Sequence, residues 1–212
     1  MSALHDAVQR ARASGLRLAL FALVCAALLA AVEALTRDTL RDYAEASRRA
    51  TLAQVLPAGS FDNDVLADSV ALSEADAALL GLRPPAVAHR ARRGGQFSGW
   101  VVESVAPNGY AGAIRMLVGV DANGVISGVR VTEHRETPGL GDYIDAARSP
   151  WSQQFIGRRI SDGLRWQVKK DGGPFDAMAG ATISARAVTA AVGRAANVLA
   201  RLPAEHNEGK QP

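Results

Sequence analysis

A threonine hydroxyl lies at the start of a helical pattern near the C-terminus, directly behind a turn made of small residues. The turn is Ala179-Gly180-Ala181, and its lack of bulk would let a large ligand approach the backbone. Thr182 follows it, so the unpaired amides and the dipole of the helix N-terminus would favour an anion beside the hydroxyl. This arrangement suits a phosphate group.

Attachment at Thr182 would have to be covalent to retain a cofactor. The helix dipole contributes only ~0.3–1 kcal/mol, or up to ~2 kcal/mol in a partly buried site, which is too little to hold a ligand against bulk solvent. The simpler alternative is that Thr182 is the N-cap residue of the helix and Gly180 only shapes the turn before it. Ser184 is a second hydroxyl at which attachment could occur.

The residue composition excludes several kinds of redox site. The only cysteine, Cys25, lies in an apolar N-terminal segment, so the rest of the chain cannot hold a thiolate-ligated iron–sulfur cluster, a cysteine nucleophile or an internal disulfide. The four histidines show no ligand spacing, and we predict no metal site. With 24 basic and 21 acidic residues, the chain gives no indication of nucleic-acid binding. Redox chemistry would therefore need a bound organic cofactor.

The apolar segment at residues 16–35, LRLALFALVCAALLAAVEAL, predicts a single transmembrane anchor. As a helix it would be about 30 Å long, which matches the hydrocarbon core of a bilayer. Arginines cluster at its N-terminal side: Arg10, Arg12 and Arg17. The positive-inside rule then places residues 1–15 in the cytoplasm and the main domain on the periplasmic or outer side. Cleavage as a signal peptide near Glu33 is the alternative, but the chain continues as a helix without a break, which favours a retained anchor.

The residues after the anchor predict an α+β domain. Residues 36–92 are expected to form a helical segment that Pro57 ends, short helical pieces and connecting loops, with a loop at 84–95. Residues 99–134 alternate in the manner of strands, and two Asn-Gly signals interrupt them at Pro107-Asn108-Gly109 and Asp121–Gly124. This pattern predicts a three-stranded antiparallel meander.

The end of the chain completes the predicted domain at residues 93–202. We expect a short helix near Ser152–Ile156, a strand at Leu164–Lys170 and a long helix at about Ile183–Leu202, followed by a flexible tail at 203–212. The predicted fold class is therefore α+β: an antiparallel sheet with packed helices, preceded by one N-terminal transmembrane helix.

Two motifs, in this order along the chain, resemble those of the FMN-binding domain family. ETPGLG begins at Glu136, within the block Glu133–Asp142, and DAMAGAT, Asp176–Thr182, resembles the flavinylation motif D-x-x-x-G-A-T. Position 179 departs from the family, which usually has Ser or Thr before the glycine. A third block, AQVLP with the following FDN, matches the segment after the membrane helix. Together with the chain length and the anchor, these motifs resemble the G subunits of Rnf-type ion-translocating electron-transport complexes.

The resemblance implies that residues 93–202 are an FMN-binding domain and that FMN is joined to Thr182 by a phosphoester bond. A separate FAD:protein FMN transferase would install it, and the motif spacing disfavours Ser184 as the acceptor. The ETPGLG loop would lie against the flavin, with polar contacts from two residues and close approach at the glycines. The implied cofactor-binding residues are Asp176, Gly180, Ala181, Thr182, Glu136, Thr137, Gly139, Leu140 and Gly141, without a catalytic residue or metal ligand.

By the same resemblance, the protein would relay electrons through covalent FMN as a single-pass subunit in the bacterial inner membrane. Its complex, a translocase, would couple electron flow between reduced ferredoxin and NAD to cation movement, and its partners would be the other subunits and, transiently, the transferase. One alternative is the C subunit of a sodium-pumping NADH:quinone reductase, which shares the motif but tends to be longer. Another is an outer-face scaffold without flavin, in which Thr182 is an ordinary helix cap.

Overall fold

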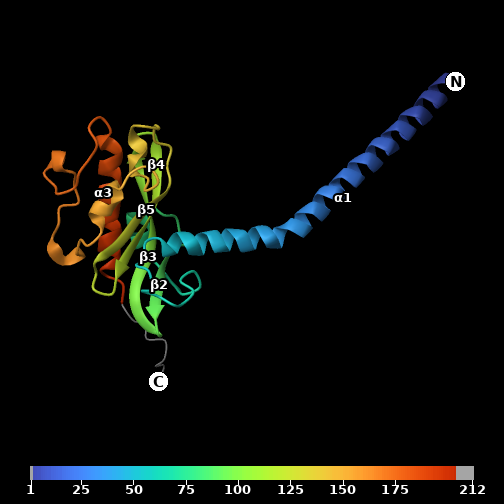
Figure 1. Ribbon diagram of the computed structural model, residues 1–212. Coiled ribbons are helices and arrows are strands. Elements are labelled where there is room, and N and C mark those ends of the chain that lie inside the picture. Colours follow the sequence, from blue (N-terminus) through green and yellow to red (C-terminus); the bar gives the residue numbers. More distant parts are fainter. Residues whose placement is uncertain (1, 204–212) are drawn as a thin grey trace. The chain divides into compact units, whose positions relative to one another are not determined.

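The structure, a computed structural model, describes residues 2–203, so residues 204–212 of the predicted tail lie outside it (Figure 1). The chain divides into two compact units, one ending at Ser47 and the other beginning at Arg48. The first unit is part of a long N-terminal helix. The second contains a sheet and its packed helices.

Helix α1 (Ser2–Ala53) contains the predicted anchor and continues through most of the helical segment expected after it. Its part from Arg17 onward includes a window with a hydropathy of 2.5, and none of that window is buried. Within the described residues it is the one helix long and apolar enough to cross a membrane. Phe21, for example, is 69% exposed. Such an apolar exposed surface suits lipid, as expected for an anchor. Retention of this segment stays a prediction.

Five antiparallel strands form one sheet in the order β1-β2-β3-β4-β5, so each strand pairs with its neighbours in the sequence. The strands are β1 (Ser69–Ala71), β2 (Val87–Arg93), β3 (Gln96–Gly109), β4 (Gly112–Asp121) and β5 (Ile126–Glu133). The last three are the predicted meander, which is confirmed. Its second turn lies at the predicted place, after Asp121. The first turn is Tyr110-Ala111 instead, because an irregularity between Ala106 and Gly109 lengthens β3.

The loop predicted at residues 84–95 is wrong, because most of it forms strand β2. Ala88 and Ala91 have no exposed surface and belong to two different hydrophobic clusters, while the arginines between and after them are polar in the sequence. Small apolar residues among charged ones give no clear alternation, so the pattern failed to indicate a strand. Gly94-Gly95 forms the turn between β2 and β3.

The strand predicted at Leu164–Lys170 is also wrong. Only Val168 pairs in a β-bridge, with Phe175, and a 3₁₀ helix η4 (Lys169–Asp171) follows it. Trp166 packs instead against helix α3, where Gly193 has no side chain and so leaves room for the indole ring. Val168 is buried and Trp166 packs against a helix, and sequence alternation alone cannot distinguish such packing from pairing in a sheet.

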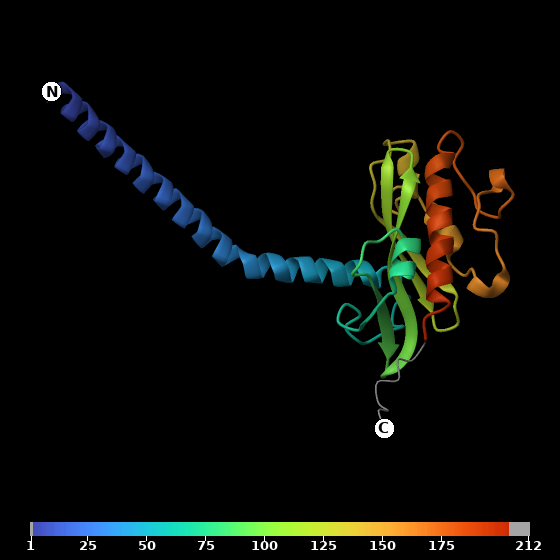
Figure 2. The same cartoon turned by 180° about the vertical axis from the view of Figure 1, so that it is seen from behind.

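Helix α3 (Thr182–Leu199) covers one face of the sheet, as the two opposite views show (Figure 1 and Figure 2). It is rich in alanine, a strong helix former, and its small buried side chains let it lie close to the strands. The short helix α2 (Glu74–Leu79) packs near it. A second, smaller cluster on the opposite face joins the end of α1 to the sheet: Leu52, Val55, Leu56, Val65, Ala91, Val101 and Leu117. The fold is therefore the predicted antiparallel sheet with packed helices.

Three further 3₁₀ helices lie in the long connection between β5 and α3. They are η1 (Gly141–Ile144), η2 (Trp151–Phe155) and η3 (Ile160–Asp162). The second corresponds to the short helix predicted near Ser152–Ile156. This connection carries both sequence motifs to the N-terminal end of α3, where they meet.

Candidate functional site

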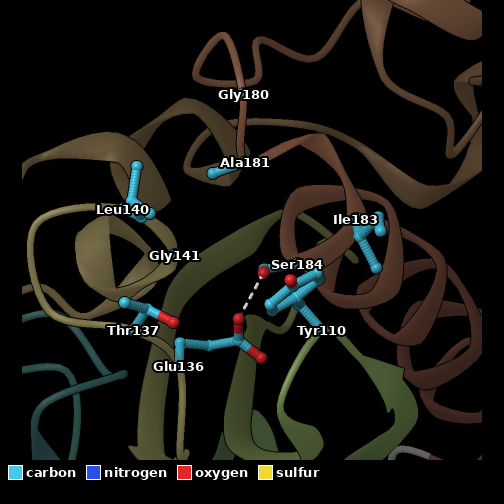
Figure 3. Close-up of a pocket in the computed structure, with 9 residues that line it drawn as sticks. All are labelled: Tyr110, Glu136, Thr137, Leu140, Gly141, Gly180, Ala181, Ile183 and Ser184. Carbon is cyan, nitrogen blue, oxygen red and sulfur yellow. Dashed lines mark hydrogen bonds between the residues drawn. The ribbon is translucent and has the colours of Figure 1, made fainter.

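A cavity of about 180 Å³ lies where the ETPGLG loop meets the first turn of α3 (Figure 3). Its lining residues are Tyr110, Glu136, Thr137, Leu140, Gly141, Gly180, Ala181, Ile183 and Ser184. Six of them are residues that the sequence motifs indicated. Residues about 40 positions apart in the sequence thus form one concave site, as a ligand-binding role for both motifs requires.

Glu136 ties together the three segments that enclose the cavity. Its carboxylate accepts a hydrogen bond from the Ser184 hydroxyl at 2.6 Å and another from the backbone amide of Ala111 at 3.2 Å (Figure 3). The residue is only 5% exposed. A side chain at position 141 would come within 2.5 Å of the carboxylate, so Gly141 allows the loop to close over it. Each carboxylate oxygen therefore already accepts a hydrogen bond from the protein itself.

Thr182 is the first residue of α3, and Ala181 occupies the N-cap position without a side-chain capping bond. The interpretation of Thr182 as an ordinary N-cap is therefore wrong. The Thr182 side chain is partly exposed, and its hydroxyl makes no hydrogen bond to the residues that the structure describes. Thr182 itself is not a lining residue, but Ala181 and Ile183 on either side of it are, so the residue is adjacent to the cavity in the chain, and its unbonded hydroxyl is available for a bond to a ligand.

Gly180 shapes the turn that leads into Thr182. The amide of Ala181 donates to the carbonyl of Met178 at 3.1 Å, which closes a four-residue turn. Gly180 is the third residue of this turn with a φ of 86°, a conformation that type II turns require and that glycine adopts without strain. The space beside its Cα is open, so the backbone conformation, rather than crowding, is what calls for glycine here.

Replacing Gly180 by valine should therefore both strain the turn and prevent covalent loading with flavin. A non-glycine residue in this conformation costs about 1–2 kcal/mol, and a branched side chain would also obstruct the approach to Thr182. Gly59→Val is the matched control, because Gly59 has a φ of 73° and open space but lies outside the cavity lining. Flavin fluorescence of the denatured proteins on a gel should be lost only in Gly180→Val. Equal fluorescence in the two variants would contradict this role.

Three predicted residues, Asp176, Gly139 and Thr182, are not among the residues that line this cavity. Asp176 is exposed and pairs with Lys169 at 2.7 Å, and its backbone contacts η2. Gly139 lines a second, open cavity of about 370 Å³, which shares Leu140 with the first and is also lined by Tyr143 and Arg148. The structure thus brings together most of the indicated residues, but Asp176, Gly139 and Thr182 do not line the same cavity.

Three lining residues were not among the predicted binding residues: Tyr110, Ile183 and Ser184. Tyr110 belongs to a hairpin turn whose position the sequence misplaced, and no motif identifies it. The helical pattern that starts at Thr182 could have indicated Ile183 and Ser184, because both residues lie in the first turn of the same helix. Ser184 is 1% exposed and donates to Glu136, so attachment of a ligand there would break that hydrogen bond.

Charged pairs and a buried phenol surround the motif. Hydrogen bonding to Arg186 lowers the pKa of Asp171, and the guanidinium contacts both carboxylate oxygens at 2.5 and 2.6 Å. Arg186 lies one helical turn after Thr182. Burial raises the pKa of Tyr143, which therefore stays protonated at neutral pH and can donate a hydrogen bond. Among the side chains that the structure describes, no group of three metal-ligating residues comes together.

The lining of the cavity combines apolar and polar groups, which suits an aromatic ligand with polar edges. Apolar side chains at its rim are largely exposed: Tyr110 70%, Leu140 53% and Ile183 46%. Glu136 and Thr137 supply the polar part of the lining, and the space beside Gly180 is open to a bulky group. A flavin ring has the matching chemistry, with flat apolar faces and hydrogen-bonding edges.

Comparisons with known proteins agree with this chemistry. Residues 109–197 match the family described as FMN-binding domain, and residues 1–55 match the family described as RnfG N-terminal region. The crystal structure of Shewanella oneidensis NqrC is 26% identical and covers 59% of this chain and 62% of its own, with a TM-score of 0.42. A TM-score of this size supports no further conclusion.

Three proteins, each named as the G subunit of an ion-translocating oxidoreductase complex, are similar over most of their lengths. That of Yersinia pestis is 45% identical over 91% of both chains. That of Pseudomonas aeruginosa (strain UCBPP-PA14) is 46% identical over 86% of this chain and 85% of its own. That of Escherichia coli (strain K12) is 45% identical over 92% and 93%. With an FMN-binding domain, the motif turn before α3 and this similarity along nearly its whole length, the chain belongs to the family of ion-translocating oxidoreductase complex G subunits.

Proposed function

We propose that the protein is a membrane-anchored subunit of an ion-translocating oxidoreductase complex that relays electrons through FMN bound covalently to Thr182. The observation that carries this proposal is the position of Thr182. Thr182 begins α3 without a capping role, and its two sequence neighbours, Ala181 and Ile183, line a cavity to which both motifs contribute. The similarity to named G subunits supports membership in such a complex and favours it over the C-subunit alternative.

Bound FMN would supply one- and two-electron redox chemistry. Thr182 provides the hydroxyl oxygen for the phosphoester, and the first-turn amides of α3 and its dipole favour the negative phosphate there. Leu140 and Ile183 provide apolar surface for the ring, and Thr137 provides a polar group at the cavity wall. The chain's part in electron transfer is to hold and orient the cofactor at a fixed place.

The proposed complex couples electron flow between reduced ferredoxin and NAD to cation movement across the bacterial inner membrane. The other subunits are then the lasting partners of this chain, and an FAD:protein FMN transferase is a transient one. This part rests on the family and on the names of the relatives. Asp176 is proposed to act during installation, since it is exposed and outside the cavity.

The attachment is tested by mass spectrometry of the peptide holding residues 171–186, taken from protein co-expressed with a flavin transferase. We expect the added mass of a phosphoester-linked FMN on Thr182. An unmodified wild-type peptide, from protein that is also colourless, would contradict the proposal and favour the alternative of a scaffold protein without flavin. Flavin found on Ser184 would be consistent with the proposed electron-transfer function but would make Ser184 the attachment residue.

The proposed topology has the domain after α1 outside the cytoplasm. The basic cluster before the apolar span motivates it. We expect a C-terminal reporter that works only outside the cytoplasm to be active. A matched fusion in which Arg10, Arg12 and Arg17 are replaced by alanine should lose much of this bias. Activity of a reporter that works only in the cytoplasm would contradict the proposed orientation.

A further inference from the structure

The backbone before Thr182 is held from outside by three side chains of the connection between β5 and α3. Tyr143 comes from η1, and Trp151 and Gln154 come from η2. They contact the two ends of the segment Asp176–Ala181. Met178, Ala179 and Gly180 are themselves exposed, so this segment has few contacts of its own.

Tyr143 holds the turn through a single hydroxyl. The phenol accepts a hydrogen bond from the Met178 amide at 3.2 Å and donates one to the Ala181 carbonyl at 3.1 Å. These are the first and last residues of the turn that leads into Thr182. Position 179 is alanine, which has no hydroxyl that could brace the turn from within. Tyr143 is 4% exposed, so water cannot easily replace these bonds.

Trp151 and Gln154 hold the other end of the segment. The indole nitrogen of Trp151 donates to the Asp176 carbonyl at 2.7 Å. The Gln154 amide oxygen accepts from the Asp176 amide at 2.6 Å. The ring of Trp151 packs edge-on against that of Tyr143, with centroids 5.4 Å apart. The two aromatic side chains therefore support each other while each fixes one end of the segment.

We propose that Tyr143 is a positioning residue for flavin installation, which fixes the turn at Met178–Ala181 so that Thr182 is presented to the transferase. The inference rests on the proposed function. In the reaction, a bond forms between Thr182 Oγ1 and the FMN-side phosphorus of FAD, the bond from that phosphorus to the AMP phosphate breaks, and AMP leaves, with the hydroxyl proton passing to solvent. Tyr143 touches none of the reacting atoms and acts through the backbone of the turn.

The proposal has a kinetic signature. If the turn is loosened, only a fraction of the protein presents Thr182 correctly, and the apparent affinity of the transferase for the chain falls by that fraction. Tyr143→Phe removes the hydroxyl and keeps the buried ring. We expect kcat/KM for installation to fall about tenfold, equivalent to about 1.4 kcal/mol, with most of the change in KM. We also expect faster hydrogen exchange at the Met178 amide and an almost unchanged melting temperature.

The experiment uses the full-length protein without flavin, purified in detergent, with FAD and purified transferase. Tyr43→Phe is the matched control, because Tyr43 is 72% exposed on α1 and far in sequence from the site. Trp151→Phe is a second variant that removes one donor to Asp176, and it should slow installation less because Gln154 remains.

The outcomes separate the inference from the proposed function. Wild-type protein that takes up no flavin would contradict both the proposed function and the inference about Tyr143. Wild type that loads while Tyr143→Phe loads with the same KM, or faster, overturns the inference alone. A slower Tyr143→Phe protein whose Met178 amide exchanges as in wild type also overturns it, because the effect would not pass through the turn.

Discussion

Thr182→Ala should abolish covalent flavin without unfolding the domain. Alanine offers no oxygen for the phosphoester, whereas Thr182→Ser keeps a hydroxyl at the same place and should retain most of the loading. Stability should change by less than about 0.5 kcal/mol, because Ala181 is the N-cap residue and alanine is the better helix former. The measurement is the flavin-to-protein ratio of denatured protein, together with thermal unfolding.

Thr189→Ala is the matched control for this substitution. It makes the same chemical change on the same helix, at a buried hydroxyl that has no hydrogen-bond partner in the described residues. Its flavin content should equal that of wild type. Full occupancy in Thr182→Ala would remove Thr182 as the attachment residue, and partial occupancy on Ser184 would reveal a second acceptor.

Glu136→Ala should cause the largest loss of stability among the site variants. The substitution leaves the buried Ser184 hydroxyl and the Ala111 amide without their acceptor, and an unpaired buried polar group costs about 1–3 kcal/mol. It also opens space under Gly141. Glu136→Gln should lose less, because an amide can accept from Ala111 and donate to Ser184. The free energy of unfolding, from denaturant titration, gives the comparison.

Glu103→Ala serves as the control for Glu136→Ala. Glu103 lies on β3 and pairs with Arg115 at 2.7 Å, but both side chains are nearly half exposed. Exposed pairs contribute about 0.2–1 kcal/mol, so this variant should stay close to wild type. A Glu136→Ala protein as stable as Glu103→Ala would show that the buried carboxylate does not tie the loop to α3.

The sequence predicts local features of this fold better than it predicts its contacts. The β3–β5 meander and α3 were predicted because their apolar residues alternate or recur at a helical period. Strand β2 was missed because Arg90 is 6% exposed, lies over the ring of Trp100, and yet reads as a surface residue. Buried charges of this kind invert the pattern on which strand prediction depends.

The candidate site was predictable only as far as its motifs. The residues around Glu136 and Thr182 were indicated in order along the chain, but their meeting depends on a connection of 3₁₀ helices without periodicity. The hydrogen bond between Glu136 and Ser184 joins residues 48 positions apart, and patterns of neighbouring residues in the sequence do not predict such a contact. Tyr110 reaches the cavity only because β3 is longer than its turn signal suggests.

The start of α3 has a consequence for how electrons could be exchanged. Below Thr182 the helix is anchored by side chains with no exposed surface, such as Ala185 and Val188, so the proposed attachment point has almost no freedom of its own. A cofactor attached there could move only as far as its own phosphate and ribityl chain reach. The electron donor and the electron acceptor would each have to come within that short distance of Thr182. The first residue of α3 would then fix the place at which electrons are exchanged. A flavin that was bound without the covalent bond and could diffuse away would have no such fixed place.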